Sequence, residues 1–220
     1  MGDSDDMHLM NVLRTALKVV TGRTETHNKK YDRIFDSLRK GDIAIDCGAN
    51  IGHYTEVMAR KGATVHAFEP NPHAFKVLKE KFSSTKNVSC HNKAVSVENG
   101  KVPLFLHENA SADQVHWSTG SSLLAIKRNV DPKRFVEIEA IDFDEFIGSL
   151  GQPIKLIKMD IEGAETKVLK KLILNGKIGI IGHLLVETHE EQIEELKPEM
   201  DEIRELIRVM ALDNIDLGWV

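Results

Sequence analysis

The chain has 220 residues and a formal net charge of −5 at pH 7, with 41% hydrophobic and 29% charged residues. This length fits a single domain, and the balance of residue types excludes a mostly disordered or fibrous chain. The negative charge also argues against a broad nucleic-acid-binding face.

Compartment signals in the sequence point to the cytoplasm. The two cysteines, Cys47 and Cys90, are isolated and form no paired framework, which is typical of a reducing compartment. Residues 1–6 are acidic, which is the wrong sign for a secretory leader, and no apolar run reaches the length of a membrane span. We therefore expect a cytoplasmic protein without a membrane span.

The apolar pattern predicts helices first and then alternating strands and helices. Two N-terminal helices are expected over residues 9–20 and 31–38, with a polar loop at 23–30 between them. Short apolar runs predict buried parallel strands at 42–46, 64–68, 88–90, 154–159 and 180–186. Helical spacing returns after Asn71-Pro72, after Asp142, and over 164–172 and 203–210. The pattern indicates an α/β fold with an open, mostly parallel central sheet and helices on both faces.

Residues 94–141 break this alternation. Extended segments at 94–97, 102–107 and 135–141 predict a β-rich insertion near the sheet edge at which ligands bind. The expected organisation is a set of N-terminal helices over 1–40, which covers the substrate side, followed by a main domain over 41–220.

A glycine loop follows the first predicted strand directly. Gly48 and Gly52 allow a tight turn and a close approach of the backbone to a ligand. Asn50 stands where the dinucleotide fingerprint requires its second glycine, so a dinucleotide is disfavoured. Asp46, at the end of the strand, would repel a pyrophosphate but attract an ammonium group.

Glu69 ends the second predicted strand, where a carboxylate can accept both hydroxyls of a ribose. Glycine loop, ammonium-binding aspartate and ribose-binding glutamate together describe a site for S-adenosylmethionine. The alternative is that the loop is only a turn and that Glu69 is a solvated strand end.

At this point the sequence resembles the FkbM-type family of class I S-adenosylmethionine-dependent methyltransferases. The resemblance covers about residues 40–190 and rests on DCGANIGHYT (46–55), AFEPNP (67–72), NKAV (92–95), GSSL (120–123), KMDIEGAE (158–165) and VETH (186–189). It implies a Rossmann-like fold with a seven-stranded sheet, and methyl transfer to hydroxyl groups, often on natural products, sugars or lipids. One departure concerns the C-terminus, where residues 214–220 suffice for one strand instead of the usual hairpin of two.

The resemblance also implies which residues hold the cofactor. The glycine loop would line the methionine side, Glu69 would hold the ribose, and Asn92 and Ala94 would border the adenine. Asp160 would lie near the transferred methyl group. The full set of expected cofactor-binding residues is Asp46, Gly48, Ala49, Asn50, Gly52, Glu69, Pro70, Asn71, Asn92, Ala94 and Asp160.

Three residues at the ends of predicted strands are candidates for catalysis: Asp160, Glu187 and His189. A hydroxyl is a poor nucleophile, so a base that accepts its proton accelerates the transfer, and histidine is the usual base near neutral pH. The alternative for His189 is a solvated position at the start of the next helix. Glu165 is expected to cap a helix, and for Glu162 capping and catalysis are equally favoured.

Magnesium or manganese would also suit a set of four of these side chains, Asp160, Glu162, Glu187 and His189. Their spacing is not diagnostic, and we expect no metal. The polar segment 107–122 is predicted to cover the acceptor, since long loops often act as lids. A disordered insertion is the alternative.

The leading function is methyl transfer to a small-molecule hydroxyl acceptor. An RNA ribose 2'-O-methyltransferase on the same fold is disfavoured by the negative charge and by the 5% aromatic content. A non-catalytic module that binds S-adenosylmethionine is the third possibility. The sequence indicates neither the acceptor nor the oligomeric state.

Overall fold

The computed structural model describes residues 24–107, 121–127 and 130–219. The chain divides into two compact units, residues 1–37 and 38–220. In the first unit, helix α2 runs over Thr24–Asp36, so the polar loop predicted at 23–30 is wrong. The polar residues of this segment form no apolar stripe, which is why periodicity missed the helix. The helix predicted at 9–20 lies outside the described residues, and the substrate-side role of the N-terminal helices stays a prediction.

The second unit alternates strands and helices. Its elements are β1 (Ile43–Cys47), α3 (His53–Arg60), β2 (Thr64–Phe68), α4 (Pro72–Lys81), β3 (Val88–His91), β4 (Ala94–Ser96), β5 (Gly100–His107), β6 (Val130–Asp142), α5 (Phe143–Ser149), β7 (Ile154–Met159), α6 (Glu165–Leu174), η2 (Lys177–Ile180), β8 (Ile181–Val186), η3 (Glu194–Leu196), α7 (Lys197–Val209) and β9 (Ile215–Asp216).

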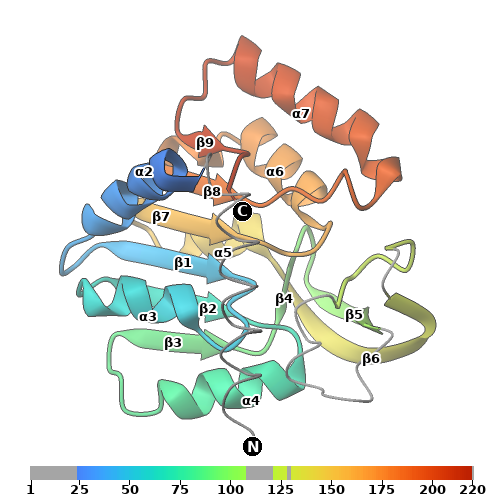
Figure 1. Cartoon of the computed structure of the whole chain (residues 1–220), viewed down its shortest axis with the longest axis horizontal. Helices are drawn as coiled ribbons and strands as arrows, with labels where there is room; N and C mark the ends of the chain where they lie inside the picture. Colours follow the sequence, from blue (N-terminus) through green and yellow to red (C-terminus); the bar gives the residue numbers. More distant parts are fainter. Residues whose placement is uncertain (1–23, 108–120, 128–129, 220) are drawn as a thin grey trace, which may run out of the picture. The chain divides into compact units, whose positions relative to one another are not determined.

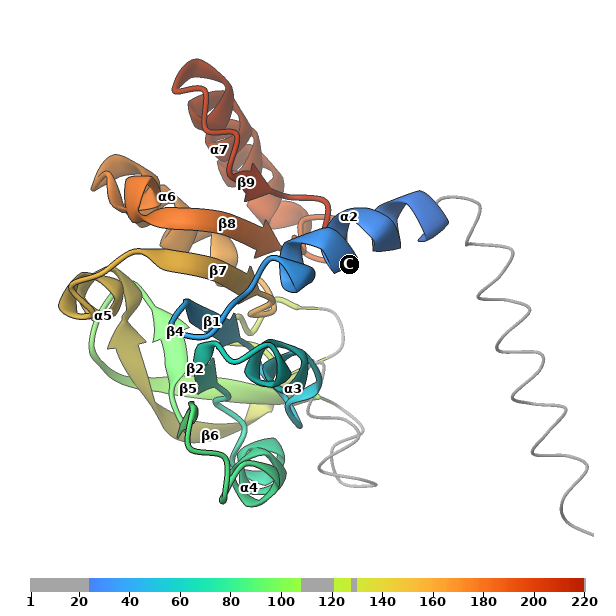
Figure 2. The same cartoon turned by 90° about the vertical axis from the view of Figure 1, so that its left-hand side faces the viewer.

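The main sheet has six described strands in the order β3-β2-β1-β7-β8-β9, and every neighbouring pair is parallel. Figure 2 shows α3 and α4 on one side of this sheet and α5 and α6 on the other. The predicted α/β fold with a parallel central sheet is therefore confirmed. Among the described residues, the main sheet has one strand fewer than the seven implied by the resemblance, because only β9 follows α7.

The insertion forms a second, three-stranded sheet in the order β4-β6-β5. It lies on the side toward which the arrowheads of β1, β2 and β7 point (Figure 1). The chain order reverses between β1 and β7, which is the point at which open α/β sheets bind their ligands. The small sheet is thus placed beside the expected ligand edge.

Local signals in the sequence explain where the helices begin. The side chain of Asn71 accepts hydrogen bonds from the backbone N–H groups of His73 and Ala74 at the start of α4. Asp142 caps α5 in the same way, through the N–H groups of Asp144 and Glu145. Within the described ranges, every helix is too short or too polar to cross a lipid bilayer.

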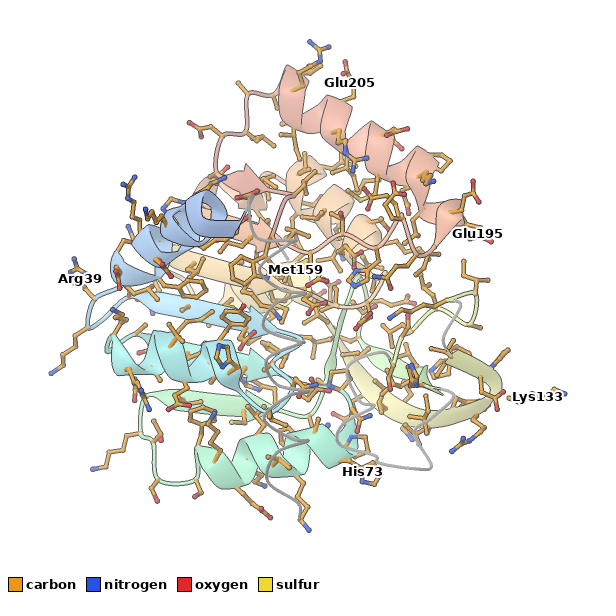
Figure 3. The ribbon with its side chains drawn as sticks, viewed as in Figure 1. Arg39, His73, Lys133, Met159, Glu195 and Glu205 are labelled. Carbon is orange, nitrogen blue, oxygen red and sulfur yellow. The ribbon has the colours of Figure 1, made fainter. Side chains whose placement is uncertain are left out.

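The apolar core lies around the central strands. Met159, labelled in Figure 3, is fully buried near the middle of the main sheet. The same core cluster includes residues of α5, α6 and α7, which pack against β1, β7 and β8. Burial on both faces explains why the central strands read as continuous apolar runs.

Candidate active site

A cavity opens at the carboxyl ends of the central strands. Its wall is formed by the loop after β1 (Gly48, Asn50), the end of β2 (Phe68 to Asn71), the start of β4 (Lys93 to Val95), the insertion (Leu104, Ser121, Leu123) and the end of β7 (Asp160 to Glu162). Seven of these lining positions were expected to bind the cofactor: Gly48, Asn50, Glu69, Pro70, Asn71, Ala94 and Asp160. Sequence segments far apart in the chain therefore meet in one hollow, as predicted.

Gly48 lets two strand ends approach each other closely. Its backbone has φ +77°, and a Cβ atom added there would lie 1.8 Å from the carbonyl oxygen of Asp160. Any other residue would therefore force the β1 loop away from the end of β7. The glycine is required by this contact as well as by its left-handed backbone.

Glu69 is held by the glycine loop and by its own turn. Its Oε2 accepts the N–H of Asn50 at 2.8 Å, and its Oε1 accepts the N–H of Asn71 at 2.8 Å. Burial raises the pKa of Glu69 to about 7, although these two hydrogen bonds oppose the rise. Each carboxylate oxygen has two lone pairs, so both can accept one more hydroxyl from the cavity.

Four residues expected to bind the cofactor lie off the cavity wall as described: Asp46, Ala49, Gly52 and Asn92. Asp46 is buried beneath the loop, where its Oδ2 accepts the hydroxyl of Thr55 at 2.6 Å. A Cβ atom at Gly52 would meet the side chains of Phe82 and Leu78.

The other two of these residues are also used inside the protein. Ala49 belongs to the apolar core beside α4. The amide nitrogen of Asn92 donates to the carbonyl oxygens of Glu69 and Pro70, at 2.9 and 3.1 Å. Direct contact of these residues with a cofactor stays a prediction, and the structure assigns all four a role in shaping the loops.

Lys158 is a buried lysine that the sequence reading did not single out. Its Nζ donates to the carbonyl oxygen of Gly48 at 3.1 Å and lies 3.5 Å from Asp160 Oδ2 and 3.8 Å from Asp46 Oδ1. Burial alone would lower the pKa of Lys158, but the charges of Asp46 and Asp160 raise it. The ammonium group thus joins the glycine loop to both acids. The sequence signal for this residue is a lysine at the next-to-last position of a mostly apolar strand.

His189 lies between carboxylates and is almost completely buried. Its Nδ1 is 3.1 Å from Glu165 Oε1, and its Nε2 is 3.2 Å from Glu162 Oε2 and 3.7 Å from Asp160 Oδ1. Burial alone would lower the pKa of His189, but the contacts with Glu162 and Glu165 raise it to about 10. Both ring nitrogens then carry protons at neutral pH. The role of base remains a prediction, and the geometry favours a fixed cation.

Lys127 extends this arrangement into the insertion. Its side chain is 2% exposed and pairs with Glu162, and the contacts of Glu162 with His189 and Lys127 lower the pKa of Glu162 although burial opposes this. Glu165 also accepts the N–H groups of Gly163 and of His189, at 2.8 and 3.1 Å. The expectation that Glu165 caps the start of a helix is therefore incomplete, because this carboxylate also accepts a hydrogen bond from His189. We call Lys127, Glu162, His189 and Glu165 the buried ion chain.

Glu187 stands at the carboxyl end of β8 and is partly exposed. Its N–H donates to the carbonyl oxygen of Met159 at 2.9 Å, which continues the pairing of β7 with β8. Burial, followed by the charge of Asp160, raises the pKa of Glu187 above its ordinary value. A carboxylate with a raised pKa is a better proton acceptor near neutral pH than an ordinary glutamate.

Asp160, Glu162 and His189 each place one ligand atom within 4.8 Å of the others, which is the spacing of a metal site. However, the carboxylate of Glu162 already contacts two side-chain cations, Lys127 and His189. The side chains of Lys127 and His189 therefore already balance the negative charge that a metal ion would balance. The expectation of no metal stays a prediction. The predicted lid at 107–122 lies mostly outside the described residues.

Comparisons with known proteins concern the family of the chain. The family model for the methyltransferase FkbM domain matches residues 46–211. The hexuronic acid methyltransferase AglP of Haloferax volcanii is 25% identical over 158 residues, which are 71% of this chain and 59% of AglP. Methyltransferase 1 of Beauveria bassiana is 24% identical over 142 residues, covering 58% of this chain and 57% of that protein. The chain thus spans less than two thirds of the length of these curated relatives.

The similarity of this chain to solved structures is weaker. Trm5b from Pyrococcus abyssi aligns with 83% of this chain and 40% of its own, at 16% identity and a TM-score of 0.38. The family match covers most of the chain and includes both the glycine loop and the end of β7. The chain belongs to the FkbM family of methyltransferases.

Proposed function

We propose that this chain is an S-adenosylmethionine-dependent methyltransferase that acts on a hydroxyl group of a small molecule. The observation that carries the proposal is Glu69, whose two oxygens are fixed by backbone N–H groups at the wall of the cavity. That is the arrangement required to accept the two hydroxyls of a ribose.

The other residues of the cavity fit the same cofactor. Gly48 lets the glycine loop pack directly against the backbone of Asp160, and both residues line the cavity. Asp160 Oδ1 is buried and has no hydrogen-bond partner among the described residues. His189 Nε2 lies 3.7 Å from this oxygen, beyond hydrogen-bond distance, so Oδ1 can still accept a hydrogen bond from a ligand in the cavity.

The chemistry follows from these positions. When bound, S-adenosylmethionine supplies a methyl group on a positively charged sulfur. Glu69 and Asp160 hold the two ends of the site, and alignment of this kind can lower a barrier by as much as about 7–11 kcal/mol. Glu187, at the end of β8, would accept the proton of the acceptor hydroxyl as that oxygen takes up the methyl group. The buried ion chain keeps the loop after β7 in place.

A sugar or sugar acid is the first acceptor to test. AglP is named as a hexuronic acid methyltransferase, and this relative supports the choice. The net charge of −5 supports a small acceptor over a nucleic acid.

Calorimetry with S-adenosylhomocysteine tests the cofactor. Glu69→Gln replaces an acceptor oxygen with a donor and should weaken binding roughly 10- to 100-fold, since hydrogen bonds to charged groups contribute about 1.5–3 kcal/mol. Its thermal transition should also fall, because a backbone N–H loses its acceptor. Glu195→Gln, at an exposed position near the start of α7 (Figure 3), is the matched control and should bind as the wild type does. Equal affinity of the two variants would remove Glu69 from the ribose.

Transfer of a labelled methyl group tests the acceptor. The wild type and Glu187→Gln are incubated with S-adenosylmethionine and, separately, with neutral sugars, uronic acids and RNA. We expect transfer to a sugar hydroxyl, reduced about 10²- to 10⁴-fold in Glu187→Gln. Transfer to RNA alone would overturn the small-acceptor proposal. Cofactor binding without transfer to any acceptor would instead indicate a non-catalytic module.

A further inference from the structure

The hydroxyl of Ser121 is a buried polar group without a use inside the described protein. The residue is 7% exposed, and its Oγ has no hydrogen-bond partner among the described residues. Buried hydroxyls in native proteins almost always have a partner, so an exception calls for an explanation. Because Ser121 also lines the cavity of the candidate active site, a ligand in that cavity is the simplest one.

The backbone around Ser121 is fixed by its neighbour. The N–H of Ser122 donates to the carbonyl oxygen of Phe105 at 3.0 Å, and the N–H of Phe105 donates back at 2.9 Å. The hydroxyl of Ser122 donates to the carbonyl oxygen of Glu162 at 2.5 Å. Side chains alternate along such an extended segment, so Ser121 and Leu123 share the face opposite Ser122. Both of them line the cavity.

This wall belongs to the apolar end of the cavity. Leu123 packs against the cluster that contains Ala94 and Leu104, and all three side chains line the cavity. A flat base requires such a surface, whereas the ribose and the methionine moiety require the polar groups at Glu69 and Asp160. Ser121 therefore presents one hydroxyl at the end of the cavity that suits the base.

Asn92, which the resemblance placed beside the adenine, has its amide nitrogen bonded to two backbone carbonyl oxygens. That nitrogen is therefore already engaged in holding the turn after β2. Asn92 also lies off the cavity wall as described, whereas Ser121 lines it, so Ser121 is placed to make a polar contact to the base.

We propose that Ser121 recognises the adenine base of the cofactor by a hydrogen bond from its hydroxyl to the edge that carries the 6-amino group. The inference rests on the proposed function, since it assumes that the cavity binds S-adenosylmethionine. It assigns a specificity-determining residue to the insertion, which is outside the core α/β unit. A serine hydroxyl can both donate and accept, so it can bond either to the ring nitrogen or to the amino group of this edge.

The test compares two ligands in two proteins by calorimetry. The ligands are S-adenosylhomocysteine and S-inosylhomocysteine, which carries an oxygen in place of the 6-amino group. Ser121→Ala should bind S-adenosylhomocysteine about 3- to 10-fold more weakly than the wild type, which is the usual effect of one hydrogen bond. The loss for S-inosylhomocysteine should differ by at least about threefold from this value, because the altered edge is the one contacted.

Thermal unfolding without ligand separates this role from a structural one. Ser121→Ala removes a buried hydroxyl that has no described partner, so its transition should stay unchanged or rise. Ser83→Ala, at an exposed serine after α4, is the matched control and should change neither affinity.

The outcomes are distinct. Unchanged affinity of Ser121→Ala for S-adenosylhomocysteine overturns the proposal, and so does an equal loss for both ligands. A wild type that binds neither ligand overturns the proposed function itself, and the inference falls with it.

Discussion

Replacing His189 by glutamine tests whether this residue is a buried cation. Glutamine has a similar length and keeps one N–H donor, but it carries no charge. The side chain of His189 is 2% exposed and that of Glu165 is 0% exposed, so the substitution leaves a fully buried carboxylate without its positive partner. Removal of one partner from a buried ion pair costs about 3–5 kcal/mol. We expect His189→Gln to lose roughly 3 kcal/mol of its free energy of unfolding near pH 6.5.

The pH dependence of this loss gives a second measure. The contacts with Glu162 and Glu165 raise the pKa of His189 in the folded protein to about 10, against an ordinary value of 6.5. A raised pKa means that the folded state holds the proton more tightly than the unfolded state. The stabilisation is therefore complete below about pH 6.5 and is lost as the pH rises toward 10. Between these values, the difference in free energy of unfolding between wild type and variant should shrink steadily as the pH rises.

Urea unfolding of the wild type and of His189→Gln at pH 6.5, 8 and 9.5 measures both quantities. His73→Gln, at an exposed histidine of α4 (Figure 3), is the matched control and should follow the wild type at each pH. A difference below about 1 kcal/mol at pH 6.5, or one that does not change with pH, would refute the buried-cation interpretation. It would also restore His189 as a candidate base.

Two further predictions concern the cavity. Gly48→Ala and Gly151→Ala both place alanine at a positive φ, but only the first meets backbone, 1.8 Å from the carbonyl oxygen of Asp160. Gly151→Ala should cost about 1–2 kcal/mol in chemical denaturation, and Gly48→Ala should cost clearly more and abolish binding of S-adenosylhomocysteine; equal costs would show that the contact is unimportant. Because the pKa of Glu69 is raised to about 7 and the ionised form accepts the ribose hydroxyls, affinity for S-adenosylhomocysteine should rise with pH through 7 and then level off. Calorimetry between pH 5.5 and 8.5 measures this, and a flat profile would contradict it.

The positions of the strands and of most helices could be predicted from the sequence because their signals are local. A buried parallel strand reads as an apolar run, as at 154–159, and Asn71-Pro72 starts a helix through its own side chain and ring. Helix α2 was misread in part because polar residues without an apolar stripe carry no such signal.

The wall of the cavity could be predicted to the extent that strand ends meet at one edge of a parallel sheet. This rule predicts that the glycine loop, Glu69 and Asp160 lie close together, and residues of all three line the cavity. It could not tell which residues near these ends face the cavity. The side chains of Asp46 and Asn92 form hydrogen bonds inside the protein, and their orientation depends on tertiary packing.

The α/β class, the glycine loop with its acidic neighbours and the membership of the family could all be inferred from the sequence alone, since each depends on residue types at short spacing. The folded arrangement was needed to show that Lys158 links two acids, that Lys127 reaches Glu162 and that His189 lies between carboxylates. These roles arise from burial and from contacts between distant parts of the chain. Once the fold has excluded water, interactions between charges become stronger. A buried hydroxyl such as that of Ser121 also loses water as a hydrogen-bond partner.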